Sequence, residues 1–248
     1  MKRKYQPVTE LTDDERIGIV KEIFSTVTGR YDFLNRLLSL RRDVAWRNFT
    51  TRKMRFFQTF RLLDIATGTA DLALDAVRKH PSVEVVGLDF VKEMLDLGRA
   101  KIEKRHLSEK IQLLQGDALS LPFRDNSFDV AAIAFGMRNI PSKILALKEM
   151  RRILVPGGQA MILEMTSPPN QFFRAIYHFY LGRILPLMAK PFSGNPAAYY
   201  YLGDSIRNFP TAEAFVRTME EAGFARVEKH SLDFGITYLH IGVKPEDK

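Results

Sequence analysis

The segment Leu63–Asp71 has the composition of a ligand-binding loop. It reads Leu-Asp-Ile-Ala-Thr-Gly-Thr-Ala-Asp and joins an apolar run to a stretch with helical periodicity. Small residues allow a ligand to approach the backbone closely, and ligands of open α/β sheets bind at the carboxyl ends of the strands. An ordinary tight turn between a strand and a helix has a similar composition, so the loop by itself is a weak indicator of a site.

Acidic residues also follow the next two apolar runs. Asp89 ends the second run, about 20 residues after Gly68, where an acid can accept hydrogen bonds from both ribose hydroxyls. Asp117 and Ala118 follow the third run, where an acid can accept the exocyclic amine of an adenine. Any one of these acids can also be a helix cap. Together with Asp64, they predict a nucleoside lying across the carboxyl edge of a sheet.

The charges of the loop favour one nucleoside cofactor over another. A nicotinamide dinucleotide requires the pattern G-x-G-x-x-G, because its diphosphate binds to a helix N-terminus. Thr67–Ala70 contains one glycine, and Asp71 would repel a diphosphate. Asp71 or Asp64 can instead face the ammonium group of a methionine-like tail. The loop therefore favours S-adenosyl-L-methionine, which leaves as S-adenosyl-L-homocysteine.

The residues around the loop predict an α/β fold. Short apolar runs alternate with amphipathic stretches, a pattern typical of a parallel sheet covered by helices on both faces. The expected strands are 61–66, 83–89, 111–116, 128–134 and 159–165, followed by closing strands at 224–233 and 236–243. Helices are expected at 70–80, 91–105, 142–153 and 211–222. The sequence Pro156-Gly157-Gly158 predicts a tight turn before the fifth strand.

Two helical regions lie outside this core. Thr12 and Glu15 form a capping box that predicts a helix from Asp13, ending near Gly29, with further helices at 31–39 and 42–58. Residues 170–206 are rich in aromatic side chains and contain three prolines, which predicts broken helices. We therefore expect a single domain over 1–248, composed of a helical cap (1–60), a cofactor-binding core (61–166), a helical insertion (167–206) and a closing helix with strands (207–248).

The composition excludes several classes of protein. The 248 residues include no cysteine, which excludes disulfides, thiolate-bound zinc and a cysteine nucleophile, and the five histidines lack the spacing of metal ligands. No stretch resembles a secretory signal or has eighteen consecutive apolar residues, so we expect a cytoplasmic protein. The net charge of +8 is concentrated in residues 1–60, with 13 Lys or Arg against 7 Asp or Glu. Such a patch suits an anionic lipid surface, an anionic ligand or nucleic acid, or it is simply a solvated basic helix.

Several longer motifs resemble one family. They are Tyr31-Asp-Phe-Leu-Asn35, Leu121-Pro-Phe-Arg-Asp-Asn-Ser-Phe-Asp129, Ala134-Phe-Gly-Met-Arg-Asn139, Tyr199-Tyr-Tyr-Leu-Gly-Asp-Ser-Ile206 and Leu239-His-Ile-Gly242. Over nearly the whole chain, the sequence is similar to the ubiquinone/menaquinone biosynthesis C-methyltransferases, which methylate demethylmenaquinol or a polyprenyl benzoquinol. The resemblance implies a class I methyltransferase-like Rossmann sandwich with a seven-stranded, mostly parallel sheet.

The resemblance also implies which residues bind the cofactor. The family's contacts correspond to Thr69, Asp89, Asp117 and Ala118, to which we add Asp64, Ala66, Gly68, Phe90 and Ala134 from the same loops. A serine often precedes the F-G-x-R-N motif in the family, so Ala134 removes one hydroxyl contact. Ala70 stands where the family commonly has glycine. We expect Ala70 to be tolerated, because the helix begins there and needs no positive φ.

For catalysis, the resemblance points to Arg138, Asn139 and Asp32. Carbon methylation needs a phenolate-like ring, with the sulfonium methyl group about 3 Å from the ring carbon. Arginine stays protonated, so we expect Arg138 to stabilise the phenolate or to orient a water that takes the proton, with Asp32 holding either one. Asn139 would bind the second ring oxygen. A purely structural Asp–Arg pair is the alternative.

The expected partners follow from a prenylated quinol that resides in a bilayer. Tyr31, Tyr199 and Tyr201 are candidate pocket residues, although such tyrosines are also typical of a core. The basic N-terminal helices and the aromatic stretch 170–201 predict peripheral attachment to the inner face of the membrane. Nucleic acid is disfavoured because no D/N-P-P-Y/W motif is present, and a homodimer is compatible with the sequence. The alternatives are a methyltransferase of another lipid or phenol, and a non-catalytic scaffold that binds cofactor or lipid.

Overall fold

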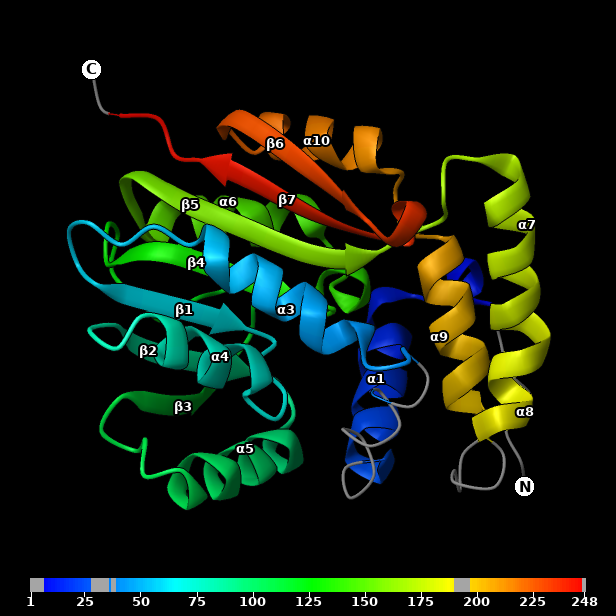
Figure 1. Ribbon diagram of the computed structural model, residues 1–248, viewed down its shortest axis with the longest axis horizontal. Helices are drawn as coiled ribbons and strands as arrows, with labels where there is room; N and C mark the ends of the chain where they lie inside the picture. The colour runs from blue at the N-terminus through cyan, green and yellow to red at the C-terminus, as the bar shows by residue number, and fades with distance from the viewer. Residues whose placement is uncertain (1–6, 28–35, 37–38, 190–196, 247–248) are drawn as a thin grey trace.

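A seven-stranded sheet runs through the centre of the part that the computed structural model describes, residues 7–27, 36, 39–189 and 197–246 (Figure 1). Its strands are β1 (Arg61–Ile65), β2 (Glu84–Asp89), β3 (Ile111–Gln115), β4 (Phe128–Ala134), β5 (Leu154–Met165), β6 (Ala225–Leu232) and β7 (Thr237–Val243). They lie in the order β3-β2-β1-β4-β5-β7-β6. The first five strands pair in parallel, and β7 is antiparallel to both β5 and β6. The predicted α/β class and mostly parallel sheet are confirmed.

Helices cover both faces of this sheet. One face packs against α3 (Arg42–Lys53), α4 (Asp71–Lys79) and α5 (Lys92–Lys104), and the other against α6 (Lys143–Ile153) and α10 (Ala212–Glu221) (Figure 1). Successive side chains of a strand point to opposite faces, so neighbours in β1 enter different apolar cores. Leu62 packs with the α3 and α4 side, whereas Leu63 packs with the α6 and α10 side. Strands buried on both faces explain the continuous apolar runs in the sequence.

The sheet differs from the prediction at the start of β5. The expected turn Pro156-Gly157-Gly158 lies inside the strand, which begins at Leu154. Gly157 has a φ of 78° and its N–H donates to the Lys244 carbonyl (2.9 Å), while the Lys244 N–H donates to the Gly158 carbonyl (2.9 Å). These bonds tie the turn residues to the chain that follows β7, and the pairing of β4 with β5 shifts its register between Phe128 and Val130.

α3 is also shorter than the predicted helix at 42–58. It ends at Lys53, and the loop that follows is held by the buried carboxylate of Asp129. That carboxylate accepts hydrogen bonds from the backbone N–H groups of residues 57–60 at 2.6–3.4 Å. Because these N–H groups are bound to a side chain of β4, they cannot continue the helix.

The first predicted helix is confirmed as α1 (Asp13–Val27), which a short 3-10 turn, η1 (Val8–Glu10), precedes. The predicted capping box is present: the Glu15 N–H donates to Thr12 Oγ1 (3.3 Å), and the Thr12 N–H donates to Glu15 Oε2 (2.9 Å). The expected helix end near Gly29 and most of the helix expected at 31–39 lie outside the described residues.

Four helical elements form a separate layer at one end of the sheet (Figure 1). They are α7 (Gln171–Phe179), the π-helical turn η4 (Tyr180–Ile184), α8 (Leu185–Ala189) and α9 (Ala197–Arg207), and we call them the helical layer. The predicted broken helices are therefore confirmed, and η4 immediately precedes the turn that contains Pro186. The layer has an apolar cluster of its own, which includes Tyr177, Leu181 and Tyr199. Among the described residues, no helix has the length and apolarity needed to cross a membrane.

Candidate active site

A cavity of about 900 Å³, open to solvent, lies at the carboxyl ends of β1, β2, β3 and β4. One side of it is formed by Ile17 and Val20 of α1. Eight of the predicted site residues line it, namely Ala66, Gly68, Asp89, Phe90, Asp117, Ala118, Ala134 and Asn139. Five others are described but are not part of its wall, namely Asp64, Thr69, Arg138, Tyr199 and Tyr201. Tyr31 and Asp32 lie outside the described residues.

Asp89 connects the second strand to the loop after the first. Its Oδ2 accepts the Gly68 N–H (2.7 Å) and its Oδ1 accepts the Val91 N–H (2.9 Å). The side chain is largely buried, and this burial raises the pKa of the carboxyl group. Each carboxylate oxygen has a second lone pair, so Asp89 can still accept two hydroxyl groups from a ligand in the cavity. This donor and acceptor pattern fits a ribose.

The loop itself has an unusual backbone. Ala66, Gly68 and Ala70 all have positive φ, at 52°, 56° and 64°. The expectation that Ala70 needs no positive φ is therefore wrong. Ala70 closes a tight turn by donating its N–H to the Thr67 carbonyl (2.9 Å), and α4 begins only at the following residue. A left-handed alanine costs about 1 kcal/mol, a cost that a glycine at this position would not incur.

The two acids of the loop have different surroundings. Asp64 is buried beneath the loop and accepts a hydrogen bond from Thr67 Oγ1 (2.7 Å); burial raises its pKa to about 7. Asp71 accepts Lys101 Nζ (2.8 Å) and pairs with Arg47 Nη2 (3.3 Å). Burial opposes ionisation of Asp71, but Arg47 and Lys101 together hold its pKa below the usual value. Asp71 is thus already paired with cations of the protein.

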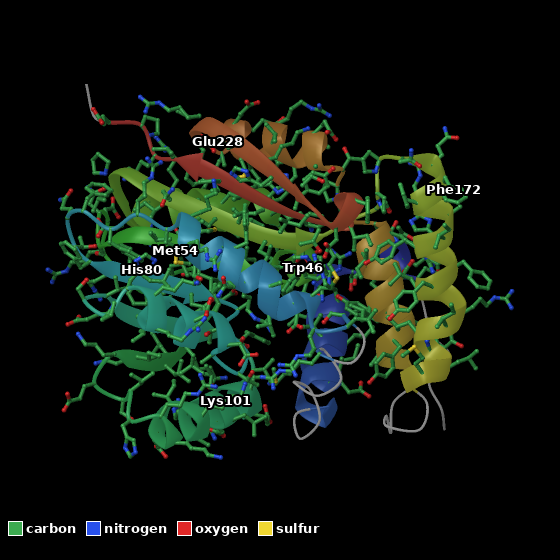
Figure 2. All side chains as sticks on the ribbon, viewed as in Figure 1. Trp46, Met54, His80, Lys101, Phe172 and Glu228 are labelled. Atoms are coloured by element: carbon green, nitrogen blue, oxygen red, sulfur yellow. The ribbon has the colours of Figure 1, made fainter. Side chains whose placement is uncertain are left out.

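Thr69 contacts Lys101, which also pairs with Asp71, and it is not part of the cavity wall. Its Oγ1 accepts a hydrogen bond from Lys101 Nζ (2.7 Å), and Figure 2 shows Lys101 on α5. The predicted contact of Thr69 with the cofactor therefore stays a prediction. For a ligand to reach the hydroxyl, it would have to share it with Lys101.

On the other side of the cavity, Arg138 forms a buried ion pair with Glu164. Arg138 belongs to the 3-10 turn η3 (Met137–Asn139), and its Nη1 donates to Glu164 Oε1 (2.6 Å) and to the Phe135 carbonyl (2.7 Å). The second oxygen of Glu164 accepts the backbone N–H of Arg138 (3.0 Å), and Oε1 also accepts the N–H of Met165 (2.9 Å). Sequence reasoning missed Glu164, although a lone acid within an apolar strand was a visible signal.

Asn139 is the residue of this turn that lines the cavity. Its Oδ1 accepts a hydrogen bond from the Tyr201 hydroxyl (3.1 Å), and burial raises the pKa of Tyr201. Tyr201 of α9 thus orients the Asn139 amide without lining the cavity itself. Tyr199 packs in the apolar cluster of the helical layer, as the alternative core interpretation expected.

Comparison with known proteins shows the family of this chain. Residues 9–244 match the family model described as the ubiE/COQ5 methyltransferase family. The chain belongs to this family. A protein of Geotalea uraniireducens named ubiquinone/menaquinone biosynthesis C-methyltransferase UbiE is 42% identical over 91% of this chain and 96% of its own. A demethylmenaquinone methyltransferase of Thermus thermophilus is 43% identical over 90% of this chain and 100% of its own.

Solved structures support the fold of this methyltransferase. A SAM-dependent methyltransferase from Aquifex aeolicus has a TM-score of 0.58 and 15% identity over 80% of this chain and 89% of its own. Phosphoethanolamine N-methyltransferase 2 of Haemonchus contortus, in complex with S-adenosyl-L-methionine, has a TM-score of 0.61 and 15% identity, over 81% of this chain and 52% of its own. The predicted family, fold, enzyme class and cofactor, S-adenosyl-L-methionine, are confirmed.

Proposed function

We propose that this methyltransferase methylates a ring carbon of a prenylated quinol, in menaquinone or ubiquinone biosynthesis or in both. The names of relatives that are about 42% identical over nine tenths of the chain support this substrate class. The observation within the structure that carries the proposal is the position of Asn139. Its amide lines the same cavity as Asp89 and Asp117, so a ring bound by the amide would lie beside the bound cofactor.

When bound, S-adenosyl-L-methionine supplies an electrophilic methyl group. The protein must then hold a phenolate-like ring about 3 Å from that group and keep water away from it. Asn139 can donate a hydrogen bond to a ring oxygen, because its own oxygen is already bound to Tyr201. Ile17 and Val20 of α1 cover the cavity with apolar surface.

Arg138 has a different role in this proposal from the one expected from the sequence. Its side chain is 7% exposed and Glu164 neutralises its charge, so its attraction for a phenolate in the cavity is weak. We therefore assign Arg138 as a positioning residue, which fixes η3 against β5 and thereby orients Asn139. The predicted contribution of Asp32 stays a prediction.

The activity test uses labelled S-adenosyl-L-methionine with reduced demethylmenaquinone or an unmethylated polyprenyl benzoquinol, followed by identification of the methylated carbon. We expect transfer to a ring carbon of at least one quinol. The Asn139→Ala variant should lose most of this turnover while its cofactor affinity, measured by calorimetry, stays close to wild type. If neither quinol accepts label while the cofactor still binds, the proposed substrate is wrong.

We further propose that the helical layer attaches the enzyme to the inner face of a membrane. Apolar side chains of α7 and α8 are exposed, including Phe172 (70%), Phe179 (61%) and Leu187 (69%), and Figure 2 shows Phe172 at the outer edge of α7. Phe234 is 74% exposed and extends this surface, because its ring stacks on that of Phe173 in α7, with the two ring centroids 4.9 Å apart. Exposed apolar surface on an amphipathic helix is typical of membrane-binding segments.

Sedimentation with vesicles of phosphatidylcholine and phosphatidylglycerol tests this attachment. The double variant Phe172→Ser/Phe179→Ser should leave most of the protein in the supernatant at low salt, whereas wild type pellets. Phe57→Ser is the matched control, since Phe57 is 51% exposed but lies in the loop before β1. Equal loss of pelleting in the control, or none in the double variant, would contradict attachment through α7.

A further inference from the structure

The charges in the cavity wall do not match all of the cofactor. Among the described wall residues, the charged ones are Asp89 and Asp117, which are both acids. These acids suit a ribose, an amine or a sulfonium, but S-adenosyl-L-methionine also carries a carboxylate. A carboxylate beside two acids is repelled unless a cation lies close to it. That cation must come from outside the wall.

Arg47 of α3 is a cation that lies behind the relevant part of the wall. If Asp89 and Asp117 bind the adenosine, the amino-acid tail extends toward the ends of β1 and β4. Phe135 lines the cavity there, and the guanidinium carbon of Arg47 lies 5.8 Å from the centroid of the Phe135 ring. The Arg47 side chain is only 12% exposed, so it is not one of the solvated basic residues of this helix.

The hydrogen bonds of Arg47 leave donors for a ligand. Its Nη2 pairs with Asp43 and, at 3.3 Å, with Asp71. Asp43 is in turn fixed by the Ser39 hydroxyl (2.7 Å). A guanidinium has five N–H donors, and within the described part of the chain both bonds come from Nη2. The two acids therefore orient the group while its Nε and Nη1 donors remain available.

We propose that Arg47 binds the carboxylate of the amino-acid tail of S-adenosyl-L-methionine. The available Nη1 group can donate a charge-assisted hydrogen bond to this carboxylate, which is stronger than a hydrogen bond between neutral groups. This inference rests on the placement of the nucleoside at Asp89 and Asp117, and it does not depend on which quinol is methylated. Arg47 would then join α3 to the cofactor.

The alternative is that Arg47, held by Asp43 on its own helix, only ties α3 to α4 through Asp71. A purely structural arginine would weaken binding of every ligand of the cavity by a similar factor when it is removed. A carboxylate-binding arginine would weaken only ligands that have the carboxylate. The ligand, rather than the protein alone, therefore has to be varied.

Calorimetry with two ligands and three proteins separates these roles. The ligands are S-adenosyl-L-methionine and its decarboxylated form, and the proteins are wild type, Arg47→Met and Arg42→Met. Arg42 is the matched control, because it lies on the same helix and pairs with the carboxylate of Asp233 but is 54% exposed. No quinol is present, so failure of the proposed quinol methylation would not affect the result.

We expect wild type to bind the decarboxylated ligand about 10- to 100-fold more weakly than S-adenosyl-L-methionine. Arg47→Met should lower the affinity for S-adenosyl-L-methionine by a similar factor and change that for the decarboxylated ligand less than about twofold. Arg42→Met should change neither affinity. Equal weakening of both ligands by Arg47→Met, or no weakening of either, would overturn the proposal. If Arg47→Met does not fold, Arg47→Lys replaces it and should show a smaller loss that is again confined to the ligand with the carboxylate.

Discussion

The two sides of the cavity are built from different kinds of interaction. On the side of β2 and β3, the carboxylates of Asp89 and Asp117 accept backbone N–H groups of neighbouring loops, at 2.7 and 2.9 Å for Asp89 and 2.9 Å for Asp117. On the side of β4 and β5, Arg138 pairs with Glu164, and Asn139 is bound by Tyr201. We call these the cofactor side and the reaction side.

This difference between the two sides indicates that cofactor binding and methyl transfer depend on separate groups of residues. Backbone N–H groups hold the acids of the cofactor side but do not neutralise them, so this side keeps negative charge for ribose hydroxyls and cationic groups. On the reaction side, charge is paired within the protein, and Asn139 presents a neutral amide to the cavity. Changes on the cofactor side should therefore affect affinity, and changes on the reaction side should affect turnover.

The largest effect is expected from breaking the ion pair of the reaction side. Glu164→Gln leaves the buried Arg138 without a counter-charge and should lower the free energy of unfolding by about 3–5 kcal/mol. Because η3 then moves, turnover should fall about 100-fold, whereas the affinity for S-adenosyl-L-homocysteine should fall much less. Urea unfolding, a quinol methylation assay and calorimetry measure the three quantities.

Two further variants test whether the ion pair itself is responsible. Glu149→Gln breaks a more exposed ion pair with Arg152, whose side chains are 23% and 31% exposed, and should cost only about 1 kcal/mol. The apolar replacement Arg138→Met/Glu164→Met should recover part of the stability that Glu164→Gln loses, because it removes the unpaired charge but leaves the backbone N–H groups of residues 138 and 165 without their acceptor. A Glu164→Gln enzyme with normal turnover would show that the reaction side does not depend on this pair.

Asp64 of β1 is buried beneath the cofactor-binding loop and should make the stability of the protein depend on pH. Burial raises its pKa to about 7 in the folded protein, above the usual value near 3.9 in an unfolded chain. Between these two values the unfolded state binds fewer protons, so the free energy of unfolding falls as the pH rises from about 4 to 7 and then levels off. The loss contributed by Asp64 amounts to roughly 4 kcal/mol.

Asp64→Asn isolates this contribution. Urea unfolding of both proteins without cofactor, at several pH values between 4 and 8, gives the difference in stability at each pH. The variant should become more stable relative to wild type as the pH rises to 7. All other titrating groups contribute equally to the pH dependence of both proteins, so their contributions cancel in the difference. A difference that does not vary with pH would mean that Asp64 ionises normally in the folded protein.

The two sides meet where Gly136 approaches Ala66. A methyl group on Gly136 would lie 2.6 Å from Ala66 Cβ, so Gly136→Ala should cost about 1–3 kcal/mol through overpacking. Adding Ala66→Gly removes the atom that clashes and suits the φ of 52° at that position. The double variant should therefore regain most of the lost stability in urea unfolding. Gly18→Ala is the control, since nothing lies within 4 Å of the new methyl group, and it should not destabilise the protein.

The cofactor side was largely predictable because its signals are local. Asp89 and Asp117 follow apolar runs directly, and strands in a parallel sheet all end at the same edge. The bounds of β1, β2, β3 and β4 agree with the predicted runs to within one residue. The positive φ of Ala70 was not predictable in this way, because it depends on how tightly the loop turns before α4 begins.

The reaction side was less predictable because its contacts join distant residues. Glu164 lies 26 residues from Arg138, and Tyr201 lies 62 residues from Asn139. Such pairs depend on which strands and helices become neighbours, and hydrophobic periodicity carries no information on that. For the same reason, the sequence did not distinguish Arg47 from the other basic residues of the N-terminal region, although it is nearly buried between Asp43 and Asp71.

The smallest effect concerns the bond between Tyr201 and Asn139. Tyr201→Phe removes only the hydroxyl that donates to Asn139 Oδ1 (3.1 Å), and the ring still fills its buried position. The Asn139 amide then loses its fixed orientation, so turnover should fall by about 5-fold, equivalent to about 1 kcal/mol. Since Tyr201 does not line the cavity, the affinity for S-adenosyl-L-homocysteine should not change measurably.

Tyr200→Phe is the control, because Tyr200 is 48% exposed on the same helix and should keep full turnover. If Tyr201→Phe instead weakens cofactor binding without slowing turnover, the two sides of the cavity are not independent.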